Sequence, residues 1–89
     1  MNRPIAVRLP EALVRLFPGL SPRVEVEARS VAEAIDALDR RWPGMRDRLC
    51  DSRPKIRRNI NVFVGGARVG LDAPLAPGAE MVVMTAVTG

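Results

Sequence analysis

The sequence predicts an α+β fold of two layers, in which one helix lies across a sheet of four to five strands. Short segments with alternating apolar and polar residues are typical of half-buried strands, and they lie on both sides of one segment with helical periodicity. The chain has 89 residues, of which 47% are apolar. This length fits one domain over residues 1–89, with residues 85–89 as an extended C-terminal tail.

Two predicted strands precede the helix. Residues 5–9 place Ile5, Val7 and Leu9 on one face, and residues 24–28 place Val24 and Val26 in the same alternating way. The segment 11–20 between them has only brief helix-like spacing, so we interpret it as a loop or a single turn. Because this connection is short, the two strands are expected to be antiparallel neighbours.

The helix is predicted to begin after Ser30. Ser30 is a favourable N-cap, and Glu33 three residues later completes a capping box. The Pro43-Gly44 pair ends the helix, residues 45–49 add a short helical turn, and residues 50–55 are expected to form a loop. One apolar stripe follows the helix at intervals of three and four residues: Val31, Ala34, Ile35, Leu38 and Trp42.

Three further strands are predicted after the helix. Residues 59–64 alternate and end at Gly65-Gly66, a pair suited to the positive φ angles of a hairpin turn, so residues 67–71 form the returning strand. Residues 80–87 are apolar on both faces, which predicts a central strand that is covered on one side. The predicted order is strand, strand, helix, strand, strand, strand.

The composition excludes several kinds of active site. The chain has no histidine and one cysteine, Cys50, which excludes histidine-activated nucleophiles, histidine metal ligands, an internal disulfide and zinc sites of several cysteines. Asp36 and Asp39 are interpreted as exposed helix charges, and Cys50 as a partly buried structural thiol. We therefore expect no catalytic centre, metal or intrinsic cofactor within the fold.

The apolar runs are too short to span a membrane, and residues 1–5 lack the apolar core of a signal peptide. These features predict a cytoplasmic protein without a membrane partner.

Positive charge is concentrated in residues 40–58. This stretch has eight basic and two acidic residues, a net charge of +6, while the whole chain has a net charge of +4. Such a stretch can neutralise phosphates, but no aromatic stacking platform or known nucleic-acid motif accompanies it. A solvated face or a docking surface for an acidic protein is favoured over nucleic-acid binding.

The C-terminal residues suggest a different kind of chemistry. The last predicted strand leads directly into Thr88 and Gly89. An ordinary frayed terminus is one interpretation. In the other, the terminal carboxylate is the reactive group, because glycine fits a narrow channel and its carboxylate becomes an electrophile once it is activated as an acyl-adenylate.

Five segments in a fixed order cover nearly the whole chain: Val7-Arg8-Leu9-Pro10, the helix with Trp42-Pro43-Gly44, Asn59-Ile60-Asn61-Val62-Phe63-Val64 before Gly65-Gly66, Leu71-Asp72 through Glu80, and Met84-Thr85-Ala86-Val87-Thr88-Gly89. Together these segments resemble the MoaD/ThiS family of sulfur carriers, which are ubiquitin-like β-grasp proteins with a mixed sheet.

The resemblance implies a carrier rather than an enzyme. An E1-like adenylyltransferase would use ATP to activate Gly89, which would then become a thiocarboxylate. The sulfur would pass to an acceptor enzyme such as the large subunit of a molybdopterin synthase, with cysteine synthase or thiamin synthesis as the other possibilities. Partner contacts would fall on Phe63, Met84, Val87 and Thr88.

The C-terminus departs from the family pattern, which ends in Gly-Gly. Aligned on Val87, the tail lacks the last glycine and is shorter by about 3.3 Å, while aligned on Gly89 it has the branched Thr88 in a glycine position. A partner adapted to this tail is one explanation. A ubiquitin-like interaction domain without thiocarboxylate chemistry is the alternative.

Overall fold

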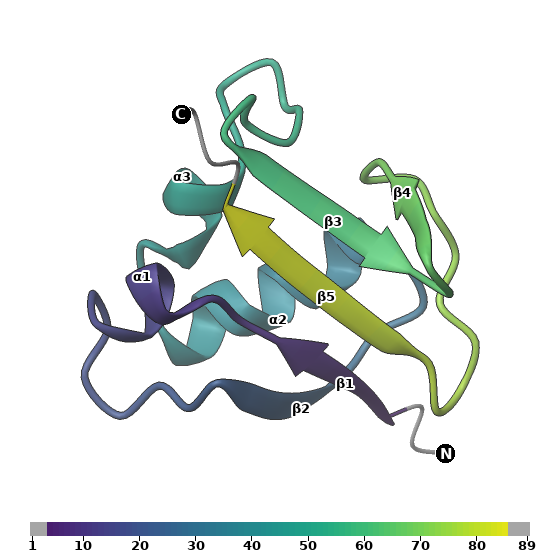
Figure 1. Cartoon of the computed structure of the whole chain (residues 1–89), viewed down its shortest axis with the longest axis horizontal. Coiled ribbons are helices and arrows are strands. Elements are labelled where there is room, and N and C mark those ends of the chain that lie inside the picture. Colours follow the sequence, from purple (N-terminus) through teal and green to yellow (C-terminus); the bar gives the residue numbers. More distant parts are fainter. Residues whose placement is uncertain (1–3, 86–89) are drawn as a thin grey trace.

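The computed structural model describes residues 4–85. Five strands form one sheet, and the helices lie on one of its faces (Figure 1). This confirms the predicted α+β class. The elements are β1 (Pro4–Arg8), α1 (Glu11–Val14), β2 (Arg23–Glu27), α2 (Val31–Arg41), α3 (Met45–Leu49), β3 (Ile60–Val64), β4 (Ala67–Val69) and β5 (Glu80–Thr85).

The sheet is mixed, with the strand order β2-β1-β5-β3-β4. The first and last strands of the chain, β1 and β5, are parallel neighbours, while the other neighbouring pairs are antiparallel. β5 is therefore the central strand, as its two apolar faces predicted. This position places the end of the described chain in the middle of the sheet rather than at an edge.

The core lies between the sheet and α2. Met81 and Val83 on β5 are nearly inaccessible to solvent, and Val82 and Met84, which alternate with them, project from the opposite face. Only apolar side chains, with Cys50 counted among them, are buried within residues 4–85. The most completely buried are Ile5, Val7, Val31, Ile35, Leu38, Met45, Leu49, Val62, Leu75, Met81 and Val83.

The predicted cap of α2 is present. Ser30 Oγ accepts a hydrogen bond from the Glu33 backbone N–H at 3.2 Å. The Glu33 carboxylate accepts from the Arg29 N–H at 2.9 Å, one residue earlier than in the usual capping box. The cap fixes where α2 begins, and the helix ends at Arg41.

Asp36 and Asp39 are partly exposed on α2, and both have partners in the following segment that the sequence did not predict. Asp39 Oδ1 accepts from the backbone N–H groups of Gly44 and Arg46, at 3.1 and 3.0 Å. Asp36 forms an ion pair with Arg46. Both carboxylates therefore join α2 to the start of α3, where backbone N–H groups have no partner within the helix.

Some boundaries differ from the prediction. β4 ends at Val69 rather than at residue 71, because the Leu71 carbonyl accepts from the Ala32 N–H and ties the chain to α2 instead of β3. The segment 11–20 contains one helical turn, α1. The predicted continuation of β5 through residues 86 and 87 lies outside the described residues. In residues 4–85 no helix has the length and apolar character needed to cross a lipid bilayer.

Candidate functional site

The open face of the sheet, which carries no helix, has an apolar patch made by Phe63, Val82 and Met84. Phe63 on β3 and Val82 on β5 are register partners, and Met84 lies one pleat further along β5, opposite Asn61. Met84 is 50% exposed, whereas Phe63 and Val82 are half-buried. We call these three side chains the open-face patch.

The patch borders a shallow hollow of about 470 Å³. The hairpin turn Gly65-Gly66 forms one side of it, and Glu80 at the start of β5 forms another. Gly65 and Gly66 have φ angles of 60° and 82°, a backbone conformation that favours glycine. Arg8 on the neighbouring strand pairs with Glu80 at 3.6 Å. An apolar surface with charged neighbours is typical of protein-docking sites.

The structure brings together two of the residues predicted to contact a partner, Phe63 and Met84. It adds Val82, which the alternation of β5 already placed on the same face as Met84. The other predicted site residues, Val87, Thr88 and Gly89, lie outside the described residues. The main chain links them to the patch, because β5 carries both Val82 and Met84 and Gly89 follows Met84 by five positions.

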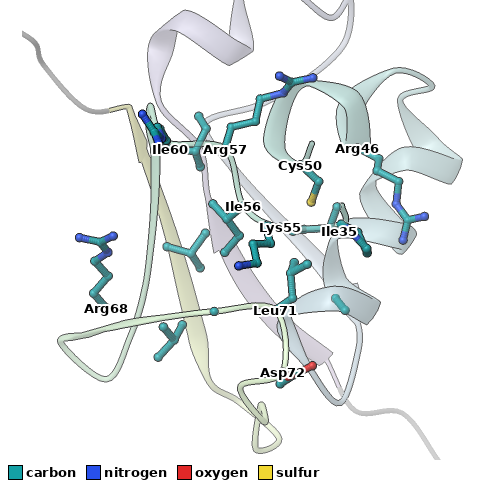
Figure 2. Close-up of a pocket in the computed structure, with 16 residues that line it drawn as sticks. Ile35, Arg46, Cys50, Lys55, Ile56, Arg57, Ile60, Arg68, Leu71 and Asp72 are labelled. Carbon is teal, nitrogen blue, oxygen red and sulfur yellow. The ribbon is translucent and has the colours of Figure 1, made fainter. Parts of the chain in front are cut away.

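A second concavity, of about 700 Å³, lies on the other side of β3. We call it the basic groove. Figure 2 shows it between α2, the end of α3, the segment 54–58 and the chain around Leu71. Its lining includes Ile35, Arg46, Cys50, Lys55, Ile56, Arg57, Arg58, Ile60, Arg68, Leu71 and Asp72.

Cys50 lines this groove but is only 6% exposed. Burial raises the pKa of its thiol, and this effect exceeds the opposite effect of the nearby Arg46 and Arg57. The burial of Cys50 thus supports its interpretation as a structural thiol rather than a reactive thiolate. Among residues 4–85, no group of three His, Cys, Asp or Glu side chains is placed to hold a metal ion.

The loop after α3 is organised by Asp51. Its Oδ1 accepts from the backbone N–H groups of Arg53 and Lys55 at 2.9 and 3.0 Å, and its Oδ2 accepts from Arg53 Nη2 at 2.8 Å. The side-chain hydrogen bond from Arg53 is the main reason that the pKa of Asp51 falls to about 2. The loop therefore holds Lys55 and Ile56 at the groove in a fixed backbone conformation.

Comparison with solved structures identifies the family. A chain of the BexX/CysO complex of Amycolatopsis orientalis is 31% identical, with a TM-score of 0.85, over 96% of this chain and 98% of that one. The chain belongs to the MoaD/ThiS family of ubiquitin-like sulfur carriers. CysO of Mycobacterium tuberculosis is 25% identical, with a TM-score of 0.83, over 93% and 99% of the two chains.

Small archaeal modifier protein 1 of Haloferax volcanii has the same fold. It is 25% identical to this chain, with a TM-score of 0.80, and the match covers 97% of this chain and 98% of that one. No family model and no curated protein matches the sequence. The structures that this MoaD/ThiS protein resembles are small carrier or modifier proteins rather than enzymes.

Proposed function

We propose that this MoaD/ThiS protein carries sulfur as a thiocarboxylate at Gly89. An E1-like enzyme forms an acyl-adenylate from the Gly89 carboxylate and ATP and releases pyrophosphate. Hydrosulfide then attacks the acyl carbon, and the bond to AMP breaks, which leaves the terminal carbonyl bonded to sulfur in place of one oxygen. The observation that supports this most directly is the 31% identity to a chain of the BexX/CysO complex over almost the full length of both chains.

The open-face patch gives the activating enzyme a place to hold the carrier. Apolar side chains that are exposed on a rigid sheet can be buried by a partner at little conformational cost. Five residues of extended chain reach at most about 18 Å, so an enzyme that contacts Met84 must have its catalytic centre within this distance of it. The patch and Gly89 thus form one recognition unit, in which the body of the protein is held and its tail is modified.

The acceptor of the sulfur is the finer part of the proposal. Molybdopterin synthesis is the first acceptor to test, and cysteine synthesis is the second because two of the similar structures contain CysO. The likeness to small archaeal modifier protein 1 supports an alternative function, a ubiquitin-like modifier or interaction domain without sulfur chemistry.

Mass spectrometry separates the two functions. The protein is incubated with ATP, a sulfur donor and the E1-like enzyme from the same source, and its intact mass is measured. A carrier gains about 16 Da when sulfur replaces oxygen, and a variant without Gly89 gains nothing. The enzyme must be shown to form a thiocarboxylate on its own carrier protein. If the mass of this protein then does not change, the proposal is contradicted and the interaction domain is favoured.

A further inference from the structure

The basic groove is separate from the open-face patch. Ile60 and Val62 line it from the side of β3 that faces the helices, whereas Phe63 and Val82 project from the opposite face. A partner that covers the patch therefore leaves the groove accessible. The groove takes no part in the proposed thiocarboxylate chemistry, so its function has to be inferred from its own shape and charge.

Five cationic side chains line the groove, against one carboxylate, Asp72. Arg46 is neutralised by its ion pair with Asp36. Arg57 Nε donates to the Asp47 carbonyl at 2.7 Å, which orients the guanidinium without neutralising its charge. Of these five, Lys55, Arg57, Arg58 and Arg68 have no ion-pair partner among residues 4–85. Arg68 is the register partner of Phe63, so it lies at the edge of the groove toward the open face. The groove therefore presents excess positive charge to solvent.

The floor of the groove is aliphatic. Ile56, Ile60 and Leu71 contribute to it, and Ile56 and Leu71 are each only partly covered by the rest of the protein. None of the three aromatic side chains of the chain lines it. A nucleic acid would have no ring on which to stack its bases, whereas leucine, isoleucine or valine side chains fit a surface of this kind.

The cations are spread along the groove instead of converging on one point. Figure 2 shows Arg46 and Arg68 on opposite sides, with Lys55 between them. A single phosphate needs several donors within hydrogen-bond distance of one group, which this arrangement does not provide. Carboxylates spaced along an extended peptide match it better, and the volume of about 700 Å³ is within the range of ligand sites.

We propose that the basic groove binds an extended acidic segment of a partner protein, whose aliphatic side chains cover Ile56 and Leu71 and whose carboxylates meet Lys55 and Arg58. The segment needs a carboxylate at about every second residue, because alternate side chains of an extended peptide point the same way. This inference does not rest on sulfur transfer, and it applies equally to a carrier or a modifier.

Binding is tested with a fluorescein-labelled peptide of ten residues in which aspartate or glutamate alternates with leucine or valine. Fluorescence anisotropy at low salt should give a Kd below about 100 µM, and the affinity should fall as salt rises. Two matched peptides serve as controls. One replaces the carboxylates by amides and the other replaces the aliphatic residues by serine, and both should bind at least about tenfold more weakly.

Charge reversal tests the location. Arg58→Glu should weaken binding about five- to tenfold, and Lys55→Glu should act in the same direction. Arg23→Glu makes the same change in net charge on β2, at the opposite edge of the sheet, and should leave the affinity within about twofold. Circular dichroism of each variant should match that of the unmodified protein, because the exchanged side chains are exposed.

Lys55 also offers a direct reporter, since it is the only lysine of the chain. Reductive ¹³C-methylation preserves its charge and gives one lysine methyl signal besides that of the α-amine, and this lysine signal should shift as the acidic peptide is added. The proposal is overturned if this signal does not move, if either control peptide binds as well as the acidic one, or if Arg23→Glu weakens binding as much as Arg58→Glu. Tighter binding of a uridine decanucleotide than of the peptide also overturns it.

Discussion

Phe63 on β3 and Val82 on β5 lie directly opposite each other in the sheet, and both project from the face without helices. Cross-strand apolar neighbours of this kind normally pack beneath a second layer. Here the second layer is absent within residues 4–85, and Met84 extends the apolar surface along the strand that leads to Gly89. A partner that docks on this surface is thereby brought close to the tail.

Met84→Asp tests this docking role. The substitution places a charge in the open-face patch, so the KM of the E1-like enzyme for this carrier should rise at least about tenfold. Because Met84 is exposed, the free energy of unfolding should change by less than about 0.5 kcal/mol. Steady-state assays of pyrophosphate release and urea unfolding measure the two quantities.

Leu16→Asp is the matched control for that experiment. Leu16 is 49% exposed, almost the same as Met84 at 50%, but it follows α1 and does not border the hollow beside the patch. The KM of the E1-like enzyme for the Leu16→Asp variant should stay within about twofold of its value for the unmodified protein. Equal effects of the two substitutions would show that apolar exposure in general, and not this face of the sheet, determines recognition.

Deletion of Thr88 tests whether the position of the terminal glycine matters. The variant still ends in glycine, but its carboxylate is withdrawn by about 3.3 Å. A displacement of this size removes the alignment needed for attack on ATP, so the rate of adenylation should fall about 100-fold or more.

Thr88→Ala keeps the tail length and should retain a rate within about tenfold of the unmodified protein. Single-turnover measurements of AMP formation compare the two variants. If the deletion variant reacts as fast as Thr88→Ala, the rate of adenylation does not depend on the length of the tail.

Asp39→Ala should destabilise the protein by about 1–2 kcal/mol, because Asp39 Oδ1 accepts from two backbone N–H groups at the start of α3. Urea unfolding followed by circular dichroism measures the loss. Asp39→Asn keeps the accepting oxygen and should lose less. Asp72→Ala removes an exposed carboxylate with no hydrogen-bond partner in the described part of the chain, and a loss as large as that of Asp39→Ala would refute the assigned role.

Asp51 should titrate at a pH of about 2, well below its ordinary pKa of 3.8. Because the folded protein holds the ionised form, the stabilisation from this group is complete above a pH of about 4 and is lost as the pH falls toward 2. The ¹³C chemical shift of the carboxyl carbon reports its ionisation. Arg53→Ala should move the midpoint upward, and an unchanged midpoint would show that Arg53 does not cause the shift.

The fold was predictable because its elements are encoded locally. Residues 80–87 were predicted to form a strand that is apolar on both faces, and the structure places β5 in the centre of the sheet. Ser30 and Glu33 marked the start of α2 in the same way. The order of strands within the sheet was not predicted, because the parallel pairing of β1 with β5 joins the two ends of the chain and leaves no local pattern in the sequence.

The two surfaces differed in how far they could be predicted. Phe63 and Met84 were named from the resemblance, and strand alternation adds Val82. The groove was foreseen only as an excess of charge, because Lys55 and Ile56 lie in a segment without periodicity whose conformation depends on Asp51. The hydrogen bonds of Asp39 were missed for a related reason, since its partners come from a turn that only the folded chain places beside it.

The chemistry at Gly89 is tested most directly by comparing the protein with a semisynthetic copy that ends in a carboxamide. Both are treated with ATP, the E1-like enzyme and a sulfur donor. The mass of the C-terminal proteolytic fragment of each protein is then measured by mass spectrometry. The free carboxylate should gain about 16 Da on the last residue while the carboxamide gains nothing. Added sulfur at another position in the chain, or an equal gain of mass in both proteins, would contradict the assignment of Gly89 as the carrier group.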